Sequence, residues 1–217
     1  GFRFSPLPVT PQRSESGQVV AEVMGTGTLE ARVRATISPK ISGRIEEVLA
    51  DQGDRVTKGD VLVRLDDDEL TQQVEIAQAA LAASKAALER LKTDRGRAVA
   101  VAEQAKRDYQ RTQQLIGQGA ITESELDKAI ESAAVADAGL ARADAAIVEG
   151  EQQILAAEKT LAYHQARLAD TQITAPFDGL IVQRQRDPGD VVVPGSPILQ
   201  LVSLDQLWIR AWVDETE

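Results

Sequence analysis

The chain has 217 residues and a formal net charge of −10, and aromatic residues make up only 3% of it. That length allows one or two domains, and so few aromatic side chains favour long helices over one large globular core. The absence of cysteine excludes disulfides and Cys-ligated zinc, and an acidic chain without a basic cluster argues against nucleic-acid binding. No run of about 18 apolar residues is present, so no transmembrane helix is predicted.

The N-terminal segment divides into a tail and a strand. Residues 1–17 are rich in proline and serine and are predicted to form the tail. Alternating residues at 18–23 give a weak strand signal, and residues 18–34 are assigned to a strand of a further β domain. The chain begins with Gly1 rather than Met and shows no secretory signal, which is compatible with a signal or anchor ahead of Gly1.

An internal repeat is the most informative feature of the sequence. Residues 37–65 align without a gap on residues 173–201, at an offset of 136 positions. The identities favour glycines and apolar residues, which fix backbone and core: Ile37/Ile173, Gly43/Gly179, Ile45/Ile181, Asp51/Asp187, Gly53/Gly189, Asp54/Asp190, Val56/Val192, Gly59/Gly195 and Leu65/Leu201. Each copy is predicted to form a strand, a turn, a short strand, a turn and a strand.

Each copy also predicts a buried face and two tight turns. Ile37, Ile41 and Ile45 are predicted to lie on one strand face, with their counterparts Ile173, Phe177 and Ile181 in the second copy. The first turns span residues 51–54 and 187–190, and in the second copy Pro188-Gly189 suits a type II turn. Six glycines are therefore predicted to be structural: Gly43, Gly53, Gly59, Gly179, Gly189 and Gly195.

Neither copy is long enough to close a core alone. The two are therefore predicted to pair as halves of one small β-sandwich, residues 35–66 with residues 171–204. That pairing requires residues 67–170 to form an excursion whose two ends meet.

The excursion is predicted to be a helical hairpin, because apolar or small residues recur at steps of three and four along both arms. Each arm has close to 50 residues, or roughly 70–75 Å of helix. Residues 95–97 (Arg-Gly-Arg) interrupt the first arm, as a kink or as a looser seam. The seam residues are Leu70, Val74, Ala77, Leu81, Ser84, Leu88, Leu91, Arg95, Ala98, Ala102, Ala105, Tyr109, Thr112 and Ile116, then Leu126, Ala129, Ala133, Ala136, Leu140, Ala143, Ile147, Gly150, Ile154, Ala157, Leu161, His164 and Leu168.

Capping signals agree with two helices. Asp66 with Glu69 predicts a capping box at the first helix, and Thr122 with Glu125 predicts one at the second. Two glycines end the first helix, so residues 117–121 are predicted to form the tip of the hairpin.

No residue is predicted to be catalytic, to bind a cofactor or to ligate a metal. The acidic run at residues 66–69 suits a helix N-terminus, where negative charge is favourable, better than a cation site. His164 is the only histidine and lies in the seam, so a His-based metal site is not expected. Met24 is the only methionine, which argues against a thioether copper site.

Short motifs at both ends of the excursion resemble a known family. Gly-Asp-x-Val-x-x-Gly stands at residues 53–59, Leu-Asp at 65–66 and Ile-Thr-Ala-Pro-Phe-Asp-Gly at 173–179. With Ser38-Pro39 and Ser-Gly-Arg-Ile at 42–45, they resemble the membrane fusion proteins of the hemolysin-D-like class, the periplasmic adaptors of tripartite efflux pumps. An alternating strand with Trp208 and Trp212 on one face opens residues 205–217, which resemble the start of that family's β-barrel domain.

The resemblance covers residues 18–217 and implies an α+β fold. Its parts are a split lipoyl (biotinyl-lipoyl-like) β-sandwich, an inserted long antiparallel α-helical coiled-coil hairpin, and strands of an incomplete β-barrel domain. The implied function is that of an adaptor without catalysis or cofactor, linking an inner-membrane transporter, proton-driven or ATP-driven, to an outer-membrane channel protein. Self-association as a hexamer is implied too, as is a periplasmic location with an inner-membrane anchor in a segment missing from this chain.

The resemblance also implies a channel-docking motif at the tip: Arg, three residues, Leu, six residues, then Ser or Thr. Arg111, Leu115 and Thr122 fit that spacing. Each also has a simpler explanation, because Thr122 is a good N-cap, Leu115 lies beside the seam, and Arg111 can be solvated.

Three other interpretations stay open. A lipoyl or biotin carrier domain would present its modified lysine on the turn between the halves, but here residues 67–170 replace that turn and residues 65–68 contain no lysine. A coiled-coil scaffold would explain the hairpin but not the repeat. A type I secretion adaptor would share the whole architecture.

Overall fold

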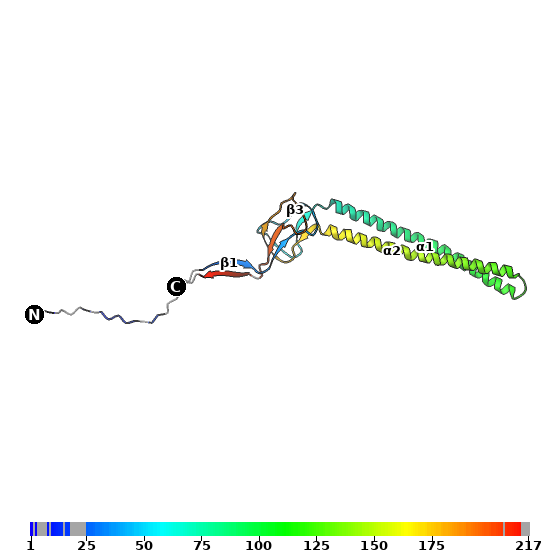
Figure 1. Ribbon diagram of the computed structural model, residues 1–217, viewed down its shortest axis with the longest axis horizontal. Helices are drawn as coiled ribbons and strands as arrows, with labels where there is room; N and C mark the ends of the chain where they lie inside the picture. Colours follow the sequence, from blue (N-terminus) through cyan, green and yellow to red (C-terminus); the bar gives the residue numbers. More distant parts are fainter. Residues whose placement is uncertain are drawn as a thin grey trace.

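The computed structural model describes residues 1, 3, 8, 10–14, 16–17, 25–205 and 207–213. Residues 2, 4–7, 9 and 15 of the predicted tail lie outside these residues, and so do the whole strand signal at 18–23 and Met24. Figure 1 shows three parts arranged in a line: a two-stranded ribbon, a small β domain and a long helical hairpin.

The β domain contains two four-stranded sheets built from both copies of the repeat. One sheet has the order β2 (Arg34–Ile37), β9 (Leu199–Val202), β7 (Gly179–Arg184) and β4 (Arg55–Val56). The other has the order β6 (Gln172–Thr174), β5 (Val61–Leu65), β3 (Gly43–Val48) and β8 (Val191–Val192). Each copy gives two strands to each sheet, so neither sheet exists without both copies.

Matching hydrogen bonds show that the two copies exchange equivalent contacts. Ile45 donates its N–H to the carbonyl of Asp190 at 2.8 Å, and its counterpart Ile181 donates to the carbonyl of Asp54 at 3.0 Å. In return, Gly53 donates to Ile181 and Gly189 to Ile45, both at 2.8 Å. The predicted pairing of the two halves is therefore confirmed.

The core of the β domain lies between the sheets. Ile45 and Ile181 face it from opposite sheets and are 1% and 0% exposed. The prediction of one strand through Ile37, Ile41 and Ile45 is wrong, because β2 ends at Ile37 and β3 begins at Gly43 in the other sheet. The chain has to cross between sheets there, and Ile41 is half-buried on the connecting loop.

The glycines of the repeat fall into two groups. Gly53, Gly59, Gly189 and Gly195 have positive φ angles between 85° and 96°, which tight turns require and which side chains disfavour. Gly179 has no such angle, but a Cβ there would lie 2.2 Å from the carbonyl oxygen of Val202.

The hairpin consists of α1 (Asp68–Ile116, 49 residues) and α2 (Glu123–Ala169, 47 residues), which run side by side to the far end of the molecule (Figure 1). Every predicted seam residue except Arg95 is buried or half-buried. At Gly150 a Cβ would lie 3.0 Å from Leu91 and 3.2 Å from Leu88, so the missing side chain lets the helices approach. The predicted hairpin is confirmed.

The structure of α1 decides two sequence predictions, the capping box at Asp66 and the interruption at residues 95–97. The capping box at Asp66 is wrong: the N-cap is Asp67 and makes no side-chain cap. Asp66 donates its N–H to the carbonyl of Arg44 at 2.9 Å, so it is unavailable to Glu69, which accepts from Gln73 instead. Residues 95–97 do not break α1, and Arg95 forms an ion pair with Asp144 of α2.

The ribbon pairs the two segments that were assigned to the further β domain. β1 (Gly25–Ala31) runs antiparallel to β10 (Leu207–Val213), and Arg210 forms an ion pair with Glu30 at 3.3 Å. Apolar side chains stay exposed on it, including Ile209 at 68% and Trp212 at 72%. Within the described residues, none of the helices combines the length and apolar character needed to cross a membrane.

Candidate functional site

The tip of the hairpin is a tight turn with defined backbone contacts. α1 ends at Ile116, and Gly119 has a φ of +68°. The N–H of Gly119 donates to Ile116 at 3.0 Å, and the N–H of Ala120 donates to Leu115 at 3.1 Å. These bonds satisfy carbonyls that the end of a helix otherwise leaves unpaired, so the turn is held in one shape.

Thr122 opens α2 with the predicted capping box, which is confirmed. Its hydroxyl accepts from the N–H of Glu125 at 3.3 Å, and the Glu125 carboxylate accepts from the Thr122 N–H at 2.8 Å. The backbone N–H of Thr122, and then its hydroxyl, hold the pKa of Glu125 below its ordinary value. The cap is therefore stronger when Glu125 is ionised.

The three residues of the docking motif lie within about two helical turns of the tip, on both sides of it. Arg111 is 68% exposed and forms an ion pair with Asp108 at 3.4 Å. Leu115 follows one helical turn later, on the same side of α1, and is half-buried. Thr122 is exposed on the other helix. All three are accessible at least in part, although Thr122 is already engaged by its cap.

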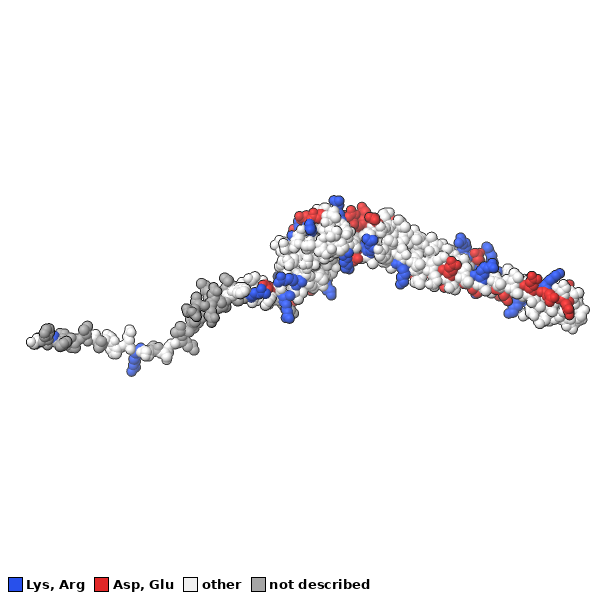
Figure 2. Space-filling model, viewed as in Figure 1, with Lys and Arg blue, Asp and Glu red and all other residues white. Residues whose placement is uncertain are grey.

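The end of the rod differs from its shaft in charge. Basic and acidic side chains are interspersed along the visible face of the shaft in Figure 2, and the extreme end is white. The sequence agrees, because residues 115–122 contain no charged side chain. An uncharged end favours close packing against another protein, since no charge has to be desolvated.

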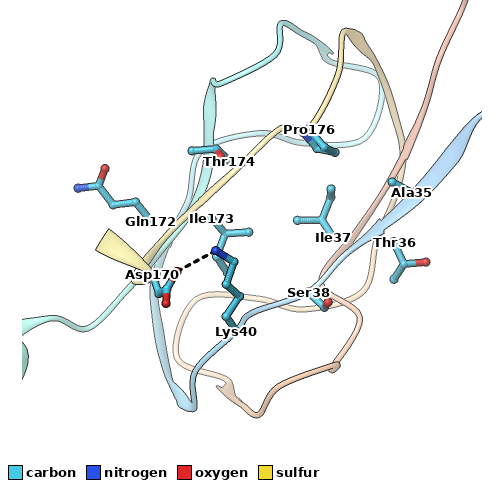
Figure 3. Close-up of a pocket in the computed structure, with 10 residues that line it drawn as sticks. All are labelled: Ala35, Thr36, Ile37, Ser38, Lys40, Asp170, Gln172, Ile173, Thr174 and Pro176. Atoms are coloured by element: carbon cyan, nitrogen blue, oxygen red, sulfur yellow. Dashed lines mark hydrogen bonds and ion pairs between the residues drawn. The ribbon is translucent and has the colours of Figure 1, made fainter. Parts of the chain in front are cut away.

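The junction between hairpin and β domain was not predicted. Lys40, on the loop after β2, forms an ion pair with Asp170 at the end of α2 at 3.0 Å, across a shallow pocket lined by β2 and β6 (Figure 3). Next to it, Thr171 is 1% exposed and donates its hydroxyl to the carbonyl of Leu168 at 2.7 Å. The Lys40–Asp170 pair joins the end of α2 to the loop after β2 at the surface of the molecule, where the Lys40 side chain is 81% exposed. No sequence signal links Lys40 to Asp170, because 130 residues separate them.

The residues weighed as metal ligands have other roles. Asp66 accepts from the N–H of Asp68 at 3.3 Å, as expected near a helix start. His164 is half-buried, and its ring lies 5.3 Å from that of Tyr163, edge to face. In the described part of the chain, no three His, Cys, Asp or Glu side chains are grouped as metal ligands.

Comparison with known proteins identifies the family. Residues 33–202 match the family described as CzcB-like, barrel-sandwich hybrid domain. The chain belongs to this family. The match spans both β-sandwich halves and the hairpin between them, so the predicted resemblance and fold are confirmed.

Individual relatives are consistent with this family assignment. The chain is 27% identical over 219 residues to the Macrolide export protein MacA of Yersinia pestis, covering 99% of this chain and 55% of the relative. It is 30% identical over 210 residues to the Fatty acid resistance protein FarA of Neisseria gonorrhoeae, covering 83% and 51%. The crystal structure of MacA from Actinobacillus actinomycetemcomitans aligns with a TM-score of 0.66 and 26% identity, covering 85% of this chain and 54% of that one. The chain thus spans about half the length of the relatives it matches.

Proposed function

We propose that this chain is the hairpin-bearing part of a periplasmic adaptor of an efflux pump. It connects an inner-membrane transporter to an outer-membrane channel, and its hairpin tip docks on the channel. The observation that carries this proposal is the shape of the molecule: two helices of 49 and 47 residues project from a small β domain and end in an uncharged turn. Relatives named for macrolide export and fatty acid resistance support the same assignment.

Docking places Leu115 and the turn against helical ends of the channel. Leu115 supplies apolar contact, and Arg111, one turn behind it, supplies a charge that pairs with an acidic or carbonyl group of the channel. The Thr122 cap keeps the turn rigid, so little conformational entropy is lost on binding.

The other end of the chain faces the transporter in this proposal. The exposed apolar side chains of the β1–β10 ribbon, such as Ile209 and Trp212, need a partner, and the rest of a β-barrel domain would cover them. Six copies of the adaptor in the periplasm, anchored at the inner membrane, would set their hairpins around one conduit.

The test is binding of the whole chain to the outer-membrane channel of the same organism. Arg111→Asp and Leu115→Ser should each weaken binding by at least about tenfold, as expected for residues at the centre of an interface. Arg107→Asp is the matched control, because it makes the same charge change one turn further from the tip and Arg107 is also exposed. Circular dichroism verifies that each variant keeps its helices.

The outcomes separate docking from a scaffold role. Loss of binding in both tip variants, with the control unchanged, supports docking at the tip. If the unaltered chain binds no channel, or if all three variants bind equally well, the docking proposal is wrong and a coiled-coil scaffold becomes the better explanation.

A further inference from the structure

The seam between α1 and α2 changes about halfway along the hairpin. Every seam residue is buried or half-buried except Arg95, which is exposed. The proximal section of the hairpin, residues 68–94 and 145–169, lies on the β-domain side of Arg95. There the buried side chain of Leu88 lies 3.2 Å from the place that a Cβ of Gly150 would take, so the two helices are in close contact.

On the tip side of Arg95, the buried positions of the seam hold only alanine. The buried residues of this distal section, residues 97–142, are Ala102, Ala105 and Ala136. A surface hollow of about 380 Å³ opens beside them, and Val101 and Val135, which line it, stay exposed. Buried alanine removes much less apolar surface from water than buried leucine. The distal section is therefore held together more weakly than the proximal section.

Ion pairs between the helices end at the same place. Within residues 68–169, all of which the structure describes, Lys85 pairs with Glu158 at 3.7 Å and Arg95 pairs with Asp144. Nearer the tip, the ion pairs of α1 stay within α1 itself. Among these residues, the Arg95–Asp144 pair is thus the last charged contact across the seam before the tip.

One glycine interrupts each helix close to this boundary. The Arg95–Asp144 pair marks two residues at one height. By that register, Gly139 of α2 lies about one helical turn nearer the tip than Gly96 of α1. A Cβ on either glycine would meet no neighbouring atom within 4 Å, so neither glycine is needed for close packing, in contrast to Gly150. Glycine weakens a helix relative to alanine, and sharp bends in helices occur at such residues.

We propose that Gly96 and Gly139 form a bending joint, at which the distal section tilts against the proximal section. A rod of two helices bends sharply only if both helices bend at nearly the same height, and each helix has its glycine there. The distal section is about 30 Å long, so a tilt of about 10° moves the tip by about 5 Å. In an adaptor, a role that rests on the function proposed above, this tilt lets the tip meet a channel that is not in line with the rod.

Residual dipolar couplings of the backbone amides test the joint. They report how strongly each section of the rod is aligned in a dilute liquid crystal, and a section that tilts is aligned less. We expect the distal section of the unaltered chain to show a smaller alignment than the proximal section. Gly96→Ala together with Gly139→Ala stiffens both helices, so this double variant should lose most of the difference.

Thr160→Ala is the matched control, because it also raises helix propensity, at an exposed position of the proximal section. It should leave the difference between the two sections unchanged. Equal alignment of both sections in the unaltered chain would show that the hairpin is one rigid rod and would overturn the proposal. A difference that survives in the double glycine variant would overturn it as well, since bending would then not depend on the glycines.

Hydrogen exchange gives a second readout. After correction for the intrinsic rate, amides of residues 96–100 and 139–143 should exchange severalfold more slowly in the double glycine variant, but not in Thr160→Ala. Unchanged exchange at these residues contradicts a joint at the glycines. Both measurements use the chain alone, so they do not depend on a channel. Arg111→Asp with Leu115→Ser, which tests docking, should leave the alignment difference unchanged, so failure of docking and failure of the joint are seen separately.

Discussion

The β domain and the hairpin bury their apolar side chains in different ways. In the β domain, six side chains are fully enclosed: Leu62, Val63, Ile181, Ile198, Leu199 and Leu201. In the hairpin, the buried residues are mostly alanines, and Leu88 is the one large side chain that reaches 8% exposure. The β domain thus packs segments that are distant in the sequence around a small dense core. The hairpin is instead stabilised by many small contacts along its length. Truncation of one buried side chain should therefore lower the free energy of unfolding more in the β domain than in the hairpin.

The largest expected effect compares one leucine from each region. Leu201→Ala opens a cavity in the centre of the β domain and should cost about 4 kcal/mol of unfolding free energy. Leu88→Ala should cost about 2 kcal/mol, because the two helices can move together over the gap. Urea unfolding, monitored in each region by hydrogen exchange, measures both values. Equal costs would show that the hairpin seam is packed as tightly as the β core.

Two equivalent glycines of the repeat give the next comparison. Gly179→Ala brings a Cβ to 2.2 Å from the backbone of Val202, so β7 and β9 must separate. Gly43→Ala meets the side chain of Leu65 at 3.3 Å, which can shift. We expect losses of about 3 kcal/mol and about 1 kcal/mol respectively. Chemical denaturation of the two variants measures the difference, and similar losses would contradict a distinction between backbone and side-chain crowding.

The same division explains what the sequence could predict. The hairpin seam, the Thr122 cap and the pairing of the two halves follow from local period, capping residues and the repeat, so they were predictable. The loop at residues 38–42 was not, because it depends on which sheet each strand joins. The missing cap at Asp66 was not predictable either, since its N–H is taken by Arg44 across the fold.

The candidate site shows the same limit. Arg111, Leu115 and Thr122 could be placed near the tip from helix ends alone, and the structure puts them there. The junction contact between Lys40 and Asp170 was beyond reach, because it depends on how the end of α2 meets the loop after β2. A docking role for the tip stays a prediction.

Two glycine substitutions, one in each region, should change stability in opposite directions. Gly53→Ala in the β domain forces a side chain into a φ of +96°, which should cost roughly 1–2 kcal/mol. Gly96→Ala in α1 meets no atom within 4 Å and should stabilise the hairpin by about 0.5–1 kcal/mol, because alanine favours helix. Thermal unfolding of both variants is the measurement. A destabilised Gly96→Ala variant would mean that residues 95–97 need glycine after all.

The smallest expected effect depends on pH and isolates the charge in the tip. Glu125→Gln keeps the capping hydrogen bonds but removes the charge. The folded-state pKa of Glu125 lies below its ordinary 4.5, so its ionised form adds stability that is fully present above about pH 5. That stability is lost as the pH falls through the lowered pKa. The variant should therefore be slightly less stable than the unaltered chain at pH 7, and the difference should shrink as the pH falls through the lowered pKa.

Hydrogen exchange of the first turn of α2, measured from pH 7 to pH 3 after correction for the intrinsic exchange rate, follows this difference. Thr122→Ala is the matched reference, because it removes the hydroxyl of the cap and should cost about 1 kcal/mol at pH 7. A Glu125→Gln difference that does not shrink as the pH falls would show that the charge of Glu125 is not what strengthens the cap. The β domain should respond to acid as well, because the backbone N–H of Thr57, and then its hydroxyl, hold the pKa of Asp60 below its ordinary value. Only the difference between Glu125→Gln and the unaltered chain, measured in the first turn of α2, therefore isolates the charge of Glu125.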